Sequence, residues 1–317
     1  MPVEKLFLAA DSGGTKTSWF LINESGTLIS NLKTIGLASV KEGMLPVCEA
    51  VAEAFEYFRP YGKISSLYLS LGGPNVAEVE SALKSVWNNC SVKVEREANG
   101  TAILAAARMV GCSAVLMCGT GSTAMGDTKR GRRYCGGWGP IYGDGGSGGG
   151  MGADALHLYL RHIDGLEKIG KLSQVFDYLT EGLRLENFND RMELKARALN
   201  INRRELAATA PKIYDLFVSG DETAAKLYHK AADEIARMAY SVSDNSKENK
   251  ILLCGGFFAN KPKFIEECHR RFAQISDAKL QYIEQFSPIV AAQMAVLNSS
   301  TVITEDLFQI LLKNKGE

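Results

Sequence analysis

The chain has 317 residues, 46% of them hydrophobic, which is enough for two domains with sizeable cores. Lys and Arg together number 36, and Asp and Glu also number 36, so the net charge is zero. We therefore expect neither nucleic acid nor an anionic membrane surface as a partner. No stretch reads as a membrane span or as a secretory signal, so we expect a cytoplasmic protein.

The predicted elements form a pattern that occurs twice along the chain. The first copy consists of strands near 5–10, 17–23 and 27–33, helix 41–58, strand 67–71, helix 76–86, strand 92–94 and helix 98–110. The second copy consists of three strands from residue 113, a long helical stretch, a strand at 251, helix 262–273, strand 280–283 and a helix from 288. This order indicates an α/β fold with a duplicated ribonuclease-H-like (actin-like ATPase) architecture.

The repeat also predicts where the domains begin and end. We predict a first ribonuclease-H-like domain over 1–112 and a second over 113–298. A helical insertion interrupts the second domain at about 151–243, where amphipathic runs such as 224–240 occur. The last segment, 299–317, is predicted to contain a helix that packs back on the first domain.

A polar, glycine-rich turn separates two apolar strand-like runs near the N-terminus. Such a turn brings together backbone N–H groups, hydroxyls and one ammonium group, which is what a polyphosphate needs. It is not a Walker A loop, because that loop leads from a strand into a helix. The predicted nucleotide-phosphate turn consists of Gly13, Gly14, Thr15, Lys16 and Thr17. The alternative is an ordinary tight hairpin turn.

Two later segments have the same character. A buried-strand pattern over 114–118 precedes a second Gly/Thr turn, and another over 252–254 precedes a pair of glycines and a helix. Glycines let the backbone approach a flat ligand, and a helix N-terminus favours anions. The second phosphate turn consists of Gly119, Thr120, Gly121 and Ser122. The third segment contributes Gly255, Gly256 and Asn260 to the predicted nucleotide site.

The order and spacing of these segments resemble the phosphate-1, phosphate-2 and adenosine motifs of the actin, Hsp70 and sugar-kinase superfamily. Within it, residues 136–139 and 142–148 resemble the glycine-tryptophan-glycine and Gly-Asp-Glu-Gly-Ser runs of N-acetylglucosamine kinases and BadF/BadG/BcrA/BcrD-type ATPases. The resemblance extends from Leu6 to about Val296. It implies ATP and Mg²⁺ as cofactors, a small sugar-like acceptor as the partner, and a homodimer.

Three carboxylates are the catalytic candidates that the resemblance implies. Asp11 ends the first strand and is predicted to hold Mg²⁺ through water, or else to act as a turn or cap residue. Glu97 stands where the family has a catalytic Asp, so it is either the general base or a charge that stabilises a helix N-terminus. Asp144 is predicted to face the acceptor or the metal, with a turn-stabilising role as the alternative.

The acceptor side of the site departs from the family pattern. Val40 stands where the amino-sugar kinases carry an Asn, and Gly145 stands where they carry a Glu. The glycine run 145–150 predicts a mobile segment over the acceptor. The predicted substrate-binding residues are Gly72, Gly137, Trp138 and Asp144. Trp138 is either a wall against which the ligand stacks or an aromatic residue of the core.

Three functions therefore remain open from the sequence. The first is an ATP-dependent phosphotransferase whose acceptor is an amino sugar such as N-acetylglucosamine or glucosamine. The second is a BadF-type ATPase that changes a partner's conformation, and the third is a nucleotide-gated binding protein without catalysis. The first is the leading prediction, and Glu97, Val40 and Gly145 keep the second and third as alternatives. The absence of a Cys-x-x-Cys pair argues against an iron–sulfur form of the second.

Overall fold

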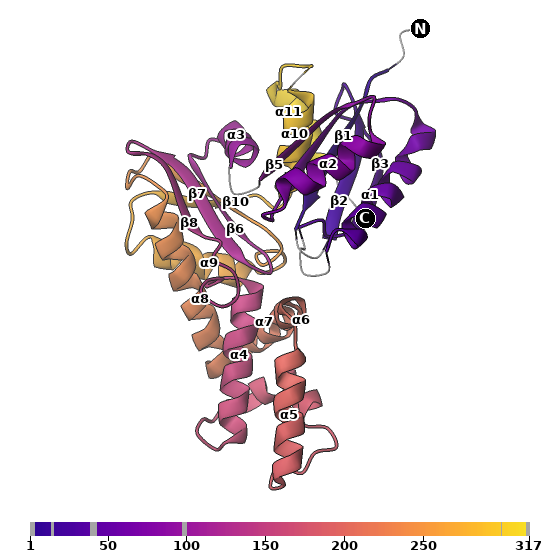
Figure 1. The fold of residues 1–317 in the computed structure, drawn as a ribbon. Coiled ribbons are helices and arrows are strands. Elements are labelled where there is room, and N and C mark those ends of the chain that lie inside the picture. Colours follow the sequence, from indigo (N-terminus) through magenta and orange to yellow (C-terminus); the bar gives the residue numbers. More distant parts are fainter. Residues whose placement is uncertain (1–3, 14–15, 39–42, 97–99, 299, 315–317) are drawn as a thin grey trace. The chain divides into compact units, whose positions relative to one another are not determined.

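The computed structural model describes residues 4–13, 16–38, 43–96, 100–298 and 300–314. The chain divides into two compact units (Figure 1): the first comprises Met1–Gly111 and Glu284–Glu317, and the second comprises Cys112–Ile283. Each unit is built on its own five-stranded sheet with helices packed against it. The predicted α/β class with two duplicated units is confirmed.

The sheet of the first unit has the strand order β3-β2-β1-β4-β5. The first three strands are antiparallel hairpin neighbours, and β4 and β5 run parallel to β1. The elements of this unit are β1 (Leu6–Ser12), β2 (Lys16–Asn23), β3 (Leu28–Ile35), α1 (Leu45–Phe58), the 3-10 helix η1 (Arg59–Tyr61), β4 (Ile64–Leu71), α2 (Val76–Val86), β5 (Ser91–Arg96), α3 (Thr101–Met109), α10 (Pro288–Leu297) and α11 (Glu305–Lys313).

Helices cover both faces of this sheet, and successive side chains of β1 point to opposite faces. Leu8 and Ala10 pack into the cluster that includes α1 and α2, whereas α10 packs against β1, β4 and α3. The structure thus places 284–298 in the first unit, whereas the sequence analysis assigned this segment to the second. The reason is that α10 is buried on nearly all sides, so its sequence carries no preference for one sheet. In α11, Leu307 lies against Gly26, and Asn314 donates a hydrogen bond to the Gly26 carbonyl at 2.9 Å.

The sheet of the second unit repeats the first strand for strand, with the order β10-β9-β6-β7-β8. Five α-helices and two 3-10 helices lie between β8 and β9 in the described chain, and none of the described helices is both long and apolar enough to cross a bilayer. The elements of this unit are β6 (Ala114–Cys118), β7 (Ser122–Thr128), β8 (Gly131–Gly136), α4 (Gly148–Ile163), η3 (Gly170–Val175), η4 (Asp177–Leu179), α5 (Phe188–Asn200), α6 (Arg203–Ala208), α7 (Ala210–Val218), α8 (Glu222–Ser241), β9 (Lys250–Cys254), α9 (Pro262–Phe272) and β10 (Lys279–Tyr282).

An aromatic cluster joins the helices of the second unit to the loop that follows β9. The Tyr228 ring of α8 stacks on Phe217 of α7 at 5.0 Å and meets Phe264 of α9 edge-on at 4.9 Å. Phe257, in the loop after β9, packs on the same cluster, with its ring centroid 5.1 Å from that of Phe264. Such contacts add to area burial, so they hold this loop rigidly on the helices.

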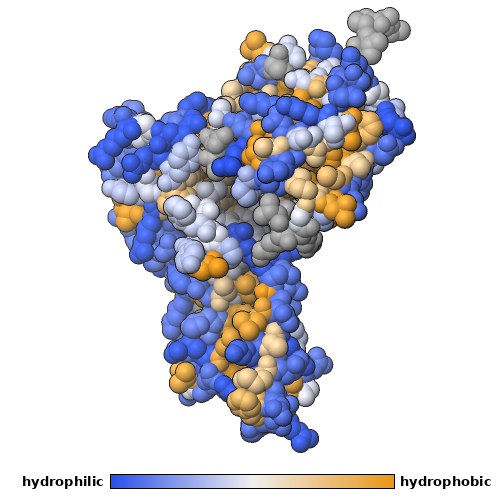
Figure 2. Space-filling model, in the orientation of Figure 1, coloured by the Kyte–Doolittle hydropathy of each residue, from blue (hydrophilic) through white to orange (hydrophobic). Residues whose placement is uncertain are grey.

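The helices between β8 and β9 expose apolar side chains to solvent. Phe188 is 71% exposed and Leu199 is 74% exposed, at opposite ends of α5. Figure 2 shows apolar surface along this lower, helical part of the second unit. Exposed apolar strips of this kind occur at interfaces between chains. The homodimer expected from the sequence stays a prediction.

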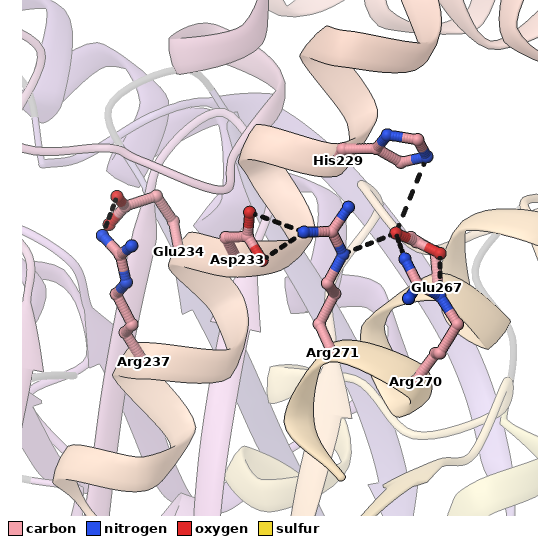
Figure 3. A network of polar contacts seen from close by, with 7 residues as sticks. All are labelled: His229, Asp233, Glu234, Arg237, Glu267, Arg270 and Arg271. Carbon is pink, nitrogen blue, oxygen red and sulfur yellow. Dashed lines mark hydrogen bonds and ion pairs between the residues drawn. The ribbon is translucent and has the colours of Figure 1, made fainter. Parts of the chain in front are cut away.

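A network of charged residues ties α8 to α9 (Figure 3). Arg271 bridges the two helices, because its Nη1 donates to Asp233 of α8 at 2.9 Å and its Nε donates to Glu267 of α9 at 2.7 Å. Arg270 also donates to Glu267, and His229 Nε2 lies 3.6 Å from the same carboxylate. Burial alone would raise the pKa of Glu267, but the hydrogen bonds from Arg270 and Arg271, with His229 close by, hold it at about 2.

We expect Glu267→Gln to lower the free energy of unfolding at pH 7 by about 1–2 kcal/mol, a value reduced for solvent screening. A carboxylate whose pKa is depressed in the folded state stabilises the fold above its unfolded pKa of 4.5 and loses this effect as the pH falls toward 2. Urea unfolding of both proteins between pH 7 and pH 2.5 measures the difference. Glu266→Gln, at the exposed neighbouring position, is the control. A difference that does not shrink below pH 4.5 would contradict the assigned pKa.

Candidate active site

The predicted phosphate-1 turn lies between β1 and β2. Gly13 N–H donates to the Lys16 carbonyl at 3.1 Å, which closes the hairpin, and Lys16 is exposed. The Thr17 hydroxyl is fully buried, 2.7 Å from that of Ser12, and it donates to the Ile35 carbonyl. Thr17 therefore supports the turn through β3. Gly14 and Thr15 lie outside the described residues.

Two carboxylates lie in one row across the sheet of the first unit. Asp11 of β1 is opposite Ser70 of β4, and Ser70 is opposite Glu95 of β5. Because these strands are parallel and in register, the three side chains share the face against which α10 packs, and the two outer Cα atoms are about two strand spacings, roughly 10 Å, apart. Glu95 was not among the residues predicted from the sequence, although its alternation with Val92 and Val94 along β5 was a signal.

Tyr68 connects Glu95 to the interior of this unit. Its hydroxyl donates to Glu95 Oε2 at 2.6 Å, and burial, followed by that hydrogen bond and by the charges of Glu95 and Asp11, raises the pKa of Tyr68 far above its ordinary value. Tyr68 thus remains a neutral donor that orients the Glu95 carboxylate. A small pocket beside them is lined also by Thr101 and by Pro288 at the start of α10.

The segment after β4 contributes backbone rather than side-chain chemistry. Gly72 N–H donates to the Ser12 carbonyl at 2.8 Å, so this predicted substrate residue lies directly beside the end of β1. Asn75 is buried and donates to the Leu37 carbonyl at 3.0 Å, while its Oδ1 accepts no hydrogen bond from any described residue. Glu97 and Val40, both central to the predicted acceptor chemistry, lie outside the described residues.

The predicted phosphate-2 turn joins β6 to β7 in the second unit. Gly119 N–H donates to the Gly121 carbonyl at 2.9 Å, and the carbonyls of Gly119 and Thr120 accept from the first N–H groups of α4, those of Gly148 and Gly149. The N–H groups of Thr120 and Gly121 donate to no described residue. The turn is therefore held by its carbonyls, and it presents two consecutive N–H groups of the kind that bind anions.

Four glycines lie in the first turns of α4, at positions 148, 149, 150 and 152. A Cβ atom would lie 2.4 Å from the Thr120 carbonyl oxygen at Gly149, 2.3 Å from the Asp144 carbonyl oxygen at Gly150, and 2.2 Å from the Leu206 carbonyl oxygen at Gly152. Close approach of backbone to backbone explains this glycine run. The sequence predicted a mobile segment over 145–150. For its helical part this prediction is wrong, because residues 148–152 are packed helix between the phosphate-2 turn and α6.

Asp144 is buried beneath the phosphate-2 turn. Its backbone is left-handed, with φ of 66°, and its Oδ1 accepts from Ser122 N–H at 3.4 Å. Its carbonyl accepts the Ser147 hydroxyl at 2.7 Å, so the residue does shape the turn. Its Oδ2 lies 2.5 Å from Arg203 Nη2 of α6, an ion pair that the sequence analysis did not foresee.

The predicted adenosine segment, Gly255 to Asn260, lies at the same sheet edge as the predicted phosphate-2 turn. Strands β6 and β9 are parallel neighbours, with Met117 opposite Cys254, so their carboxyl ends meet. Gly255 has φ of 106°, and a Cβ there would lie 2.3 Å from the Cys118 carbonyl oxygen. Gly256 faces open space, and Asn260 is left-handed with φ of 57°. The structure thus brings together two of the three predicted nucleotide segments.

The glycine-tryptophan-glycine segment follows β8. Gly137 has φ of 76° and donates its N–H to the Ser122 carbonyl at 2.9 Å, so it lies against the phosphate-2 turn. Trp138 is 77% exposed and Tyr142 is 86% exposed. The alternative in which Trp138 belongs to the core is therefore wrong, and its role as a stacking wall stays a prediction.

The sequence profile of the BadF/BadG/BcrA/BcrD ATPase family matches residues 10–295. The chain belongs to this family. The resemblance drawn from the three glycine-rich turns is confirmed, and the match includes every described site segment from Asp11 to Asn260.

Individual relatives are similar over much of the chain. An N-acetyl-D-glucosamine kinase of Dictyostelium discoideum is 25% identical over 258 residues, which cover 75% of this chain and 79% of the relative. An N-acetylmuramic acid/N-acetylglucosamine kinase of Clostridium acetobutylicum is 27% identical over 173 residues, 53% of this chain and 55% of the relative. A solved structure from Chromobacterium violaceum, a structural-genomics target assigned as an N-acetylglucosamine kinase, superposes with a TM-score of 0.72 at 21% identity over 92% of this chain and 99% of that one. The last likeness supports the two-unit actin-like fold.

Proposed function

We propose that this protein is an ATP-dependent kinase that phosphorylates a hydroxyl group of an amino sugar such as N-acetylglucosamine or glucosamine. The observation that carries the proposal is the phosphate-2 turn, whose two open N–H groups lie at the same sheet edge as the glycines after β9. Both similar curated proteins are named as kinases of N-acetylated amino sugars. We further propose a cytoplasmic location and a homodimer.

In this proposal each glycine-rich segment has one task. Gly119–Ser122 and Gly13–Thr17 bind the phosphates of ATP through backbone N–H groups, Thr hydroxyls and Lys16. Gly255 and Gly256 receive the adenosine, because the space above Gly256 is open to a flat ligand and Gly255 lets the loop turn closely against the Cys118 carbonyl. Asn260 and the adjoining start of α9 complete this side.

Asp11 is the proposed site for Mg²⁺. No group of three or more His, Cys, Asp or Glu in the described part of the chain could hold a metal ion by itself. This suits Mg²⁺ bound with a nucleotide, because that ion takes one or two carboxylates and completes its shell with phosphates and water. Asp11 is the last but one residue of β1, close to the phosphate-1 turn, and is only partly buried. When bound, the ion would neutralise phosphate charge.

Glu97 is the proposed general base. The acceptor hydroxyl oxygen forms a bond to the γ-phosphorus of ATP, the bond to the β-bridging oxygen breaks, and ADP leaves. Glu97 accepts the proton that the hydroxyl loses. Gly72, Gly137 and Trp138 are the proposed contacts of the acceptor. Asp144, which the sequence also predicted there, is 3% exposed and has Ser122 N–H and Arg203 at its two carboxylate oxygens, so for Asp144 we propose the turn-stabilising alternative.

A phosphate-transfer screen tests the proposed function. The protein with Mg-ATP is offered N-acetylglucosamine, glucosamine, N-acetylmuramic acid and glucose, with one sample lacking acceptor. We expect an amino sugar to give at least a tenfold higher rate of ADP release than the sample without acceptor, together with a sugar phosphate detected by mass spectrometry. ADP release that no sugar accelerates would overturn the kinase proposal in favour of an ATPase. Absence of both activity and ATP binding would overturn the nucleotide site.

A further inference from the structure

Arg203 comes from the helical segment between β8 and β9 but reaches the phosphate-2 turn. It is the first residue of α6, and a capping box fixes where that helix begins. Asn202 Oδ1 accepts from Arg204 N–H at 2.9 Å and from Glu205 N–H at 3.1 Å, while Glu205 Oε2 accepts from Asn202 N–H at 2.8 Å. The backbone of Arg203 is thereby fixed, and its side chain extends over α4.

The guanidinium of Arg203 lies directly on Gly121. A Cβ atom at Gly121 would be 1.9 Å from Arg203 Nη2, and one at Gly149 would be 3.3 Å from Arg203 Cγ. The absence of side chains at these two glycines is therefore what lets the arginine approach the turn. Nη2 thus lies against Gly121, one of the two turn residues whose N–H groups donate to no described residue.

The ion pair beneath the turn is held in place but is incompletely hydrogen-bonded. Asp144 is 3% exposed, whereas the Arg203 side chain is 39% exposed, so the carboxylate anchors the arginine from the protein side. Asp144 Oδ2 and Arg203 Nε are both buried, and neither makes an aligned hydrogen bond with a described residue. Arginine carries five donors in a rigid fork. Because Nε is enclosed and the side chain is partly exposed, the donors that remain for a further acceptor above the turn are those of the two Nη groups that Asp144 does not take.

We propose that Arg203 binds the terminal phosphate of ATP at the phosphate-2 turn and that Asp144 positions it there. This inference rests on the proposed function, because it places ATP at the same turn. One guanidinium and two adjacent N–H groups suit a tetrahedral group with three equivalent oxygens better than they suit a neutral sugar hydroxyl. Charge at the transferring phosphoryl group is what kinase sites stabilise.

Calorimetric titration with ATP and with adenosine tests this role. Arg203→Ala should raise the Kd for ATP about 10- to 100-fold, as expected for loss of charge-assisted hydrogen bonds. The Kd for adenosine, which has no phosphate, should stay within twofold of wild type. Arg203→Lys should lie between the two, because it keeps the charge but loses the fork. Arg204→Ala removes the same charge one residue along α6 at an exposed position and should change neither constant.

The possible results separate this inference from the proposed function. Wild-type protein that binds no ATP would overturn both. If Arg203→Ala bound ATP as tightly as wild type does, the inference alone would be overturned. Equal losses of ATP and adenosine affinity in Arg203→Ala would also overturn it, because they would indicate a structural role. Steady-state kinetics of Arg203→Ala distinguish phosphate from a carboxylate of the acceptor. If its KM rose for N-acetylmuramic acid and not for N-acetylglucosamine, the anion bound by Arg203 would be the acceptor's carboxylate, and the assignment to phosphate would be overturned.

Discussion

Replacement of Glu97 by Gln is expected to lower sugar phosphorylation about 10²–10⁴-fold while ATP affinity stays near that of wild type. The substitution keeps the size of the side chain and removes its ability to accept a proton in the transition state. Initial rates at saturating Mg-ATP and sugar give the change in kcat, and calorimetry gives the Kd for ATP. A fall in kcat without a change in ATP affinity would place Glu97 in the transfer step.

Two companion variants sharpen this test. Glu95→Gln changes an acid near the end of β5, two residues before Glu97 in the sequence, and its amide oxygen still accepts the Tyr68 hydroxyl, so we expect less than a fivefold effect. A large loss in Glu95→Gln with normal rates in Glu97→Gln would move the base to Glu95. Glu97→Asp tests the length of the side chain, because a shift of about 1 Å can change a rate about 10²-fold. A rate above wild type would mean that the pocket fits the shorter carboxylate.

Local patterns were sufficient to predict most of the fold. Strand, glycine-rich turn and strand read directly from the sequence at β1–β2 and β6–β7, because each turn needs only neighbouring residues to form. The unit to which α10 belongs could not be predicted. Eight of its ten residues are buried, so no polar stripe marks the side that meets β1 and β4.

The candidate site was predictable where it is made of backbone and not where it is made of distant side chains. Gly119–Ser122 and Gly255 follow strands that are parallel neighbours, so the topology alone brings them together. Arg203 starts a short helix far along the chain, and its partner Asp144 is known only from the packing of α4 on α6. An arginine in the first turn of a helix is typical of a solvated surface, so composition gave no signal for it.

The glycine run at the start of α4 shows the same limit. A cluster of glycines is compatible with a mobile loop and with tight backbone packing, and only the neighbours decide between them. At Gly152 the neighbour is the backbone of Leu206, whose carbonyl oxygen, carbon and Cα would all lie within 3 Å of a Cβ. This contact holds α6 against α4 and so keeps Arg203 at the phosphate-2 turn.

Gly152→Ala is therefore expected to lower the free energy of unfolding by about 1–3 kcal/mol, the usual cost of overpacking. Helix propensity alone predicts the opposite sign, a gain of about 1 kcal/mol on replacing glycine by alanine inside a helix. The sign of the change measured by urea unfolding thus decides between packed and mobile backbone. Ala153→Gly, at the exposed next position, calibrates the propensity of this part of α4.

If Gly152→Ala stabilised the protein, residues 148–152 would not be pressed against α6, and the placement of Arg203 would lose its support. If it destabilises, ATP affinity should fall with it, because α6 must shift away from the turn that Arg203 covers.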